Sequence, residues 1–96
     1  MEEKEKRVAV LIDAENVSSK YIEIILNEAI SLGNIIIKRI YGDWTNLTMS
    51  SWKSVILNNS VQPIQQYSNV TGKNSSDSAL IIDAMDLLYQ GRLDVF

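Results

Sequence analysis

The five residues from position 8 to position 12 constrain the fold more than any other part of this chain. They read Val-Ala-Val-Leu-Ile, a continuous and largely branched apolar run that stops abruptly at Asp13. Such a run is typical of a β-strand buried on both faces, as parallel strands are when helices cover the sheet. We therefore expect a central parallel strand with a polar carboxyl end.

Alternating helices and strands are expected after this first strand. Ser18 can cap a helix whose apolar residues recur at helical spacing, and Gly33 supplies its C-terminal stop. Residues 35–41 predict a second strand, which closes at Gly42. Residues 46–58 predict a second helix, although several Ser, Thr and Asn residues make it intrinsically weaker.

The second half of the chain continues the alternation. Residues 61–67 predict a short third strand, in which Pro63 favours an edge position or a strand start. A polar loop leads to a helix from Ser75 or Ser76 to about Gln90, and its many apolar residues predict deep packing. Residues 93–96 resemble the start of a fourth strand. Repeated strand–helix units predict an α/β fold with a parallel sheet and helices on both faces.

Composition limits the classes of function. The 96 residues, 46% hydrophobic and 22% charged, suit one globular domain at residues 8–96 behind a charged tail at residues 1–7. The chain has no cysteine and no histidine, which leaves oxygen ligands for any metal chemistry. No apolar run reaches membrane-spanning length, so we expect a cytoplasmic protein without a membrane partner. The net charge of -3 indicates no broad basic field for nucleic acid.

Polar side chains are expected to meet at one edge of the sheet. Asp13, Asn16 and Asp43 follow predicted strands, and Asp77 begins the helix after the third strand. Ligands of open parallel sheets bind beyond the carboxyl ends of the strands. Oxygen-bearing side chains at such an edge suit a hard divalent cation, Mg²⁺ or Mn²⁺, which activates water and binds phosphate.

Simpler explanations exist for each of these residues. A carboxylate such as Asp13 at a strand end often caps the neighbouring turn, and Asn16 and Asp43 are common turn formers. Asp77 near a helix start interacts favourably with the helix dipole. Asp83 lies six positions later, about 9 Å along the helix and rotated by about 120°, so the two carboxylates do not readily share one ion. We expect Asp83 to satisfy nearby polar groups or to hold the site in place.

Three stretches resemble one known family. Residues 8–17 contain a strand that ends in Asp followed by a nearby Asn, and residues 39–44 read Arg-Ile-Tyr-Gly-Asp-Trp. Residues 73–85 run from a lysine to an aspartate-containing helix with a second Asp inside. The chain is similar, in this order of motifs, to the NYN family and its LabA-like bacterial branch.

This resemblance implies a PIN-like, Rossmann-like three-layer α/β/α sandwich that cleaves RNA with Mg²⁺ or Mn²⁺. Asp13 and Asp77 carry over as metal-binding, catalytic carboxylates, and Asn16 as a supporting residue. Asp43 and Asp83 carry over as further supporting residues, and Lys73 is a source of positive charge near the leaving oxygen. The remaining acidic motif of the family, Ser-x-Asp-x-Asp-Phe, follows the fourth strand. We therefore expect the C-terminal part of the domain to be missing after Phe96 and this fragment to be inactive.

Two other classes of function remain open. The chain can be a noncatalytic RNA-binding or regulatory domain of the same fold. An aspartyl phosphotransfer enzyme of the haloacid-dehalogenase type is less consistent, because that chemistry needs a second Asp two residues after the first, where this chain has Glu15. We also expect apolar surface left uncovered by the missing strand to favour homo-oligomers.

Overall fold

The computed structural model describes residues 6–46, 49–66 and 75–96, with backbone alone for residues 75–78. Its strands and helices alternate along the chain as the sequence predicts. In order they are β1 (Arg7–Asp13), the short 3-10 helix η1 (Ser19–Tyr21), α1 (Ile22–Leu32), β2 (Asn34–Gly42), α2 (Trp52–Asn59), β3 (Gln62–Gln65) and α3 (Ser75–Gln90).

The strands form one parallel sheet in the order β1-β2-β3. Pro63 lies in β3, at an edge of this sheet, as its missing amide hydrogen predicts. On the other side of β1, Val95 forms a parallel bridge with Val8, and the amide of Ala9 donates to its carbonyl at 2.9 Å. Of the predicted fourth strand, the structure has this single bridge, which gives β1 a neighbour on each side.

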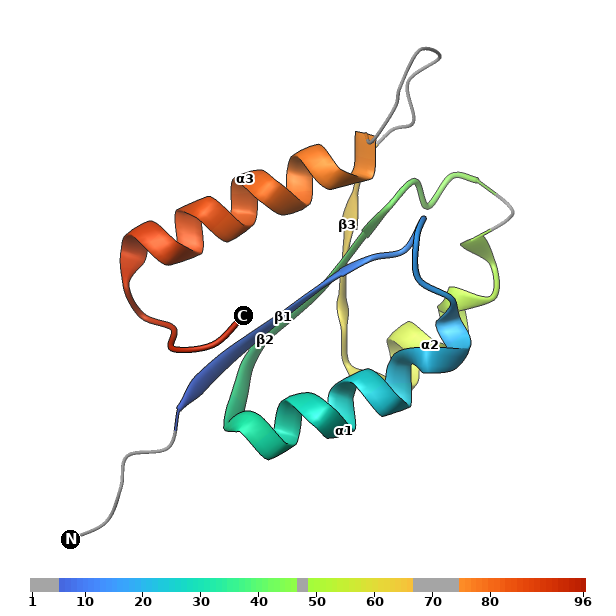
Figure 1. The fold of residues 1–96 in the computed structure, drawn as a ribbon. Helices are drawn as coiled ribbons and strands as arrows, with labels where there is room; N and C mark the ends of the chain where they lie inside the picture. Colours follow the sequence, from blue (N-terminus) through green and yellow to red (C-terminus); the bar gives the residue numbers. More distant parts are fainter. Residues whose placement is uncertain (1–5, 47–48, 67–74) are drawn as a thin grey trace, which may run out of the picture.

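Helices cover both faces of the sheet. Figure 1 shows α1 and α2 on one face and α3 on the other, which is the expected three-layer α/β/α arrangement. The buried core lies between the sheet and the α1 and α2 layer. It contains Val8, Val10, Ile12 and Ile40 from the strands, Ile22, Leu26 and Ala29 from α1, and Trp52 and Val61. All nine side chains are at most 8% exposed, so this layer contributes most of the apolar burial in the described residues.

Two predictions about the helices are wrong. α2 begins at Trp52 and not at Asn46, because the polar residues before it form turns in which Met49 donates to Asn46 and Lys53 to Ser50. The α3 helix is not deeply packed. Leu87 is buried, whereas a second set of its apolar side chains is 56–94% exposed: Ile81, Ile82, Met85, Leu88 and Tyr89. The apolar side chains of α3 point to several sides of the helix, but α3 packs against β1 and β2 along one side only.

The helices that the structure describes all fall short of the length and apolarity that crossing a lipid bilayer requires.

Candidate functional site

The turn after β1 holds the carboxylate of Asp13 in a defined orientation. Its Oδ1 accepts from the amide of Glu15 at 3.0 Å, and its Oδ2 accepts from Nδ2 of Asn16 at 2.5 Å. The backbone carbonyl of Asp13 accepts from the amides of Asn16 and Val17. Asp13 is partly exposed at the end of the buried strand β1. Its carboxylate is therefore oriented by its own turn and is also accessible to solvent.

Asp13 lies on the face of the sheet that α3 covers. It pairs with Tyr41, and paired residues of parallel strands point to the same face. The Tyr41 hydroxyl donates to Oδ2 of Asp83 in α3 at 2.6 Å, and Nη1 of Arg39 lies 3.5 Å from the same oxygen. These contacts fasten α3 onto β2 directly beside the end of β1.

The start of α3 lies at the edge where the strands end, which we call the carboxyl edge of the sheet. The amide of Ala79 donates to Oε1 of Gln66, the residue after β3, at 2.7 Å. The chain beyond α3 returns to the opposite edge, where the amide of Asp94 donates to the carbonyl of Arg7. α3 therefore runs away from the carboxyl edge, and its direction is visible in Figure 1.

This direction places the backbone of Asp77 at the carboxyl edge, near the end of β3. Asp77 lies in the first turn of α3, six residues before Asp83. This separation puts Asp77 about 9 Å closer than Asp83 to the carboxyl edge. The side chain of Asp77 and the whole of Lys73 lie outside the described residues. The backbone thus brings Asp77 to the edge and face on which Asp13 lies, and the roles of both residues stay predictions.

Asp43 binds groups of its own turn and of the neighbouring strand. Its side chain is buried, and Oδ1 accepts from the amide of Thr45 at 3.1 Å, from the Thr45 hydroxyl at 2.5 Å and from Nε2 of Gln65 at 2.9 Å. Gln65 also accepts from the amide of Trp44 at 3.0 Å. With three donors on one oxygen, Asp43 is arranged to hold the ends of β2 and β3 together.

The environment of Tyr41 keeps its hydroxyl protonated. Burial raises the pKa of Tyr41 well above its ordinary value, and the hydrogen bond to Asp83 and the charge of that carboxylate raise it further. The nearby Arg39 guanidinium offsets part of this pKa increase. Tyr41 is consequently a permanent hydrogen-bond donor to Asp83 at neutral pH.

The donor chemistry of the carboxyl edge is compatible with a hard cation, although the described carboxylates do not converge. In the described part of the chain, no group of three or more acidic side chains is close enough to hold a metal ion. Asp13, Asp43 and Asp83 all accept hydrogen bonds, and of these three Asp13 and Asp83 are partly exposed whereas Asp43 is buried.

Two further residues, Gln65 and Gln66, contribute to this edge and belong to no motif in the sequence. Gln65 joins Asp43 to Trp44, and Gln66 anchors the start of α3. Nε2 of Gln66 is buried and has no hydrogen-bond partner within the described residues. Gln65 follows the apolar Ile64 at a strand end, which is the same signal that identified Asp13, whereas Gln66 has no such signal.

Comparison with known proteins identifies a family but no individual relative. The family model described as NYN domain matches residues 7–96, all but the first six residues of the chain. Neither the curated proteins nor the solved structures gave a match.

Proposed function

The chain belongs to the NYN domain family, whose members are nucleases of the PIN-like superfamily, and on this basis we propose that it cleaves RNA phosphodiester bonds at the carboxyl edge of its sheet. The observation that supports this most is the position of Asp13. Its carboxylate follows a buried strand, is oriented by Asn16 and lies on the face covered by α3.

Asp13 and Asp77 are the residues that we assign to a divalent cation, Mg²⁺ or Mn²⁺. Both offer carboxylate oxygens, the ligands that these ions prefer. Asn16 donates to Asp13 and thereby keeps one carboxylate oxygen in place. A cation held there supplies a water of lowered pKa and binds the phosphate oxygens of the substrate.

The supporting residues act on the shape of the site. Asp83, bonded to Tyr41, fixes the position of α3 over the sheet and therefore the place of Asp77 relative to Asp13. Asp43 fixes the turn that follows β2. We assign Lys73, which precedes α3 in the sequence, a contact with the negatively charged phosphate. The assignment of Lys73 rests on the family resemblance alone.

The test is cleavage of a single-stranded RNA, with and without Mn²⁺, by the full-length protein that contains this domain. We expect Mn²⁺-dependent cleavage that Asp13→Asn and Asp77→Asn each reduce by more than about 100-fold, because even residues that only orient metal ligands are worth 10- to 100-fold. Asp86→Asn is the matched control, since it removes the same charge from an exposed position of α3. Equal rates for Asp13→Asn and Asp86→Asn would contradict the assignment of Asp13.

A noncatalytic RNA-binding domain is the second candidate. It is favoured by the observation that no three acidic side chains converge in the described residues. This alternative predicts RNA binding that is independent of Mn²⁺, with no cleavage in the wild-type chain. Measured binding and cleavage on the same preparation therefore separate the two functions.

A further inference from the structure

A cavity of about 310 Å³ lies beside the turn after β2, on the α2 side of the sheet. This volume is at the lower end of the roughly 300–1,000 Å³ of small-ligand sites. Its apolar walls are Trp44, Met49, Ile56, Leu57 and Pro63. They come from the turn, the segment before α2, α2 itself and β3, so the cavity is a product of the fold and not of one local segment.

The indole of Trp44 is held in place with its ring available to the cavity. Its Nε1 donates to the carbonyl of Ile64 at 3.0 Å, and its backbone amide donates to Gln65 at 3.0 Å. Because the polar atom of the indole is already bonded, Trp44 offers ring surface to a ligand and no free hydrogen-bond donor. An oriented aromatic ring among aliphatic walls suits a flat, apolar group.

The cavity lies near the carboxyl edge, on the face of the sheet opposite to that of Asp13. A Cβ placed on Gly42 would lie 3.5 Å from the Trp44 ring and 3.2 Å from Cβ of Ala14. Trp44 and Ala14 therefore both border the Cβ position of Gly42, and Ala14 is the residue after Asp13. An RNA strand that occupies both the cavity and the Asp13 site must therefore pass over the carboxyl edge of the sheet.

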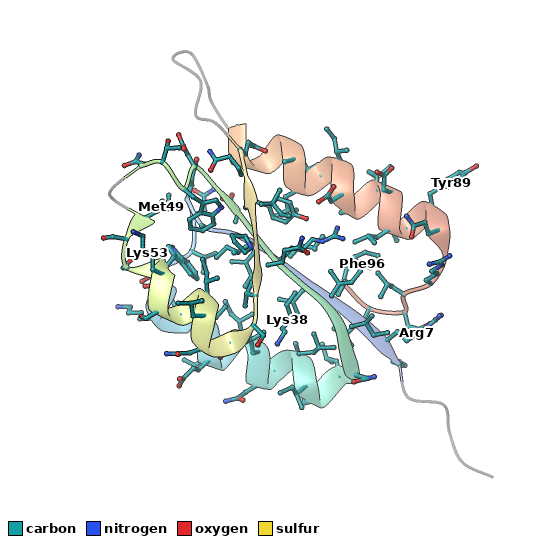
Figure 2. The ribbon with its side chains drawn as sticks, turned by 180° about the vertical axis from the view of Figure 1, so that it is seen from behind. Arg7, Lys38, Met49, Lys53, Tyr89 and Phe96 are labelled. Carbon is teal, nitrogen blue, oxygen red and sulfur yellow. The ribbon has the colours of Figure 1, made fainter. Side chains whose placement is uncertain are left out.

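The polar groups around the cavity suit a nucleotide. Lys53, Asn46 and Ser50 line it together with the apolar walls. Figure 2 shows Met49 and Lys53 side by side in this part of the molecule. A lysine ammonium can contact a phosphate, and an amide and a hydroxyl can bond to a base edge. Proteins that bind single-stranded nucleic acid combine positive charge with aromatic rings in this way.

We propose that this cavity binds one nucleobase of single-stranded RNA, stacked on Trp44, while a neighbouring phosphate contacts Lys53. The inference rests on the proposed function, because it makes the cavity a binding site for the RNA that is cleaved at Asp13. An apolar side chain of a protein partner is the competing occupant of the same walls. The nucleobase is favoured by the lysine in the cavity and by the oriented ring of Trp44.

The two tryptophans provide a direct test, because each contributes one indole N–H signal in a ¹H–¹⁵N correlation spectrum. The Trp44→Phe variant assigns the two signals. A single-stranded oligoribonucleotide is then titrated into the wild-type chain in EDTA, so that cleavage does not intervene. We expect the Trp44 signal to shift saturably, while the signal of the buried Trp52 stays in place.

A variant at the wall of the cavity measures the contribution of the base. Leu57 is 80% exposed, so Leu57→Glu is compatible with folding, and it should weaken RNA binding by about 5- to 150-fold, the range for one stacked base. Ile24→Glu, at a 60% exposed position of α1, is the matched control and should bind as the wild type does. An abasic oligomer of the same length should leave the Trp44 signal unmoved.

The outcomes separate the cavity from the nuclease function. A Trp44 signal that RNA does not move, in a protein that cleaves RNA, would overturn base binding and leave the nuclease intact. An equal shift with the abasic oligomer would also overturn it, since no base would then occupy the cavity. A saturable shift with base-containing RNA in a protein without Mn²⁺-dependent cleavage would support base binding and contradict the nuclease proposal.

Discussion

Replacing Tyr41 with phenylalanine removes one hydroxyl group between β2 and α3 and is expected to lower the free energy of unfolding by about 1.5 kcal/mol. Hydrogen bonds to charged groups contribute about 1.5–3 kcal/mol. The Tyr41 side chain is fully buried, and its bond to Asp83 is short at 2.6 Å. The Asp83 side chain is 31% exposed, so water can replace part of the lost bond, which favours the lower end of that range.

A double-mutant cycle in urea isolates this bond from the other effects of each substitution. The cycle combines Tyr41→Phe with Asp83→Ala and is expected to give a coupling energy of about 1.5 kcal/mol. The control pair is Arg7 and Asp94, which also joins distant residues but has side chains that are 45% and 41% exposed. Exposed ion pairs contribute about 0–1 kcal/mol, so its coupling should be smaller.

Two results would refute this reasoning. A coupling energy near zero for Tyr41 and Asp83 would mean that the bond does not hold α3 on the sheet. A coupling energy below that of Arg7 and Asp94 would mean that burial does not determine the strength of these two interactions. Either result would also weaken the support for placing the start of α3 at the carboxyl edge of the sheet.

Three further predictions concern stability. Gly33→Ala should cost about 1–3 kcal/mol in urea unfolding, because its Cβ would lie 2.4 Å from the Lys6 carbonyl oxygen; an unchanged midpoint would contradict this packing. Trp52→Ala should cost about 3–5 kcal/mol by the same assay, since Trp52 is 3% exposed in the core, and a loss below 1 kcal/mol would contradict that burial. The raised pKa of Tyr41 should make stability fall above about pH 10, where the unfolded chain releases the proton that the folded chain keeps. The contribution of the raised Tyr41 pKa to the free energy of unfolding is complete below that pH and lost above it. In alkaline unfolding, the free energy of unfolding of Tyr41→Phe should therefore fall less steeply with pH than that of the wild type, and parallel curves of stability against pH would contradict the raised pKa.

Local patterns in the sequence determined much of the fold. The apolar run of β1, the alternation of strands and helices and the edge position of Pro63 depend on neighbouring residues, and all are present in the structure. The exposure of α3 could not be predicted in this way. Apolar residues such as Ile82 and Met85 show that a helix has apolar sides, but not how many of those sides meet another element.

In the candidate site too, local contacts follow from the sequence and long-range contacts do not. The contact between Asp13 and Asn16 spans three residues and follows from turn chemistry. The bond between Asp43 and Gln65 spans 22 residues, and the bond between Tyr41 and Asp83 spans 42. Such partners depend on strand register and helix placement, which a single sequence does not specify. The sequence could therefore name the acidic residues but not what each carboxylate binds.

Whether Asp13 and Asp77 share a divalent cation is tested most directly by paramagnetic broadening of backbone amide signals with Mn²⁺. We expect substoichiometric Mn²⁺ to broaden first the amides of residues 13–16 and of the first turn of α3. Asp13→Asn should abolish this pattern, and Asp86→Asn should retain it. Broadening centred on other acidic residues, such as Glu23 and Glu28 of α1, or a pattern that Asp13→Asn leaves unchanged, would contradict a metal site at the carboxyl edge of the sheet.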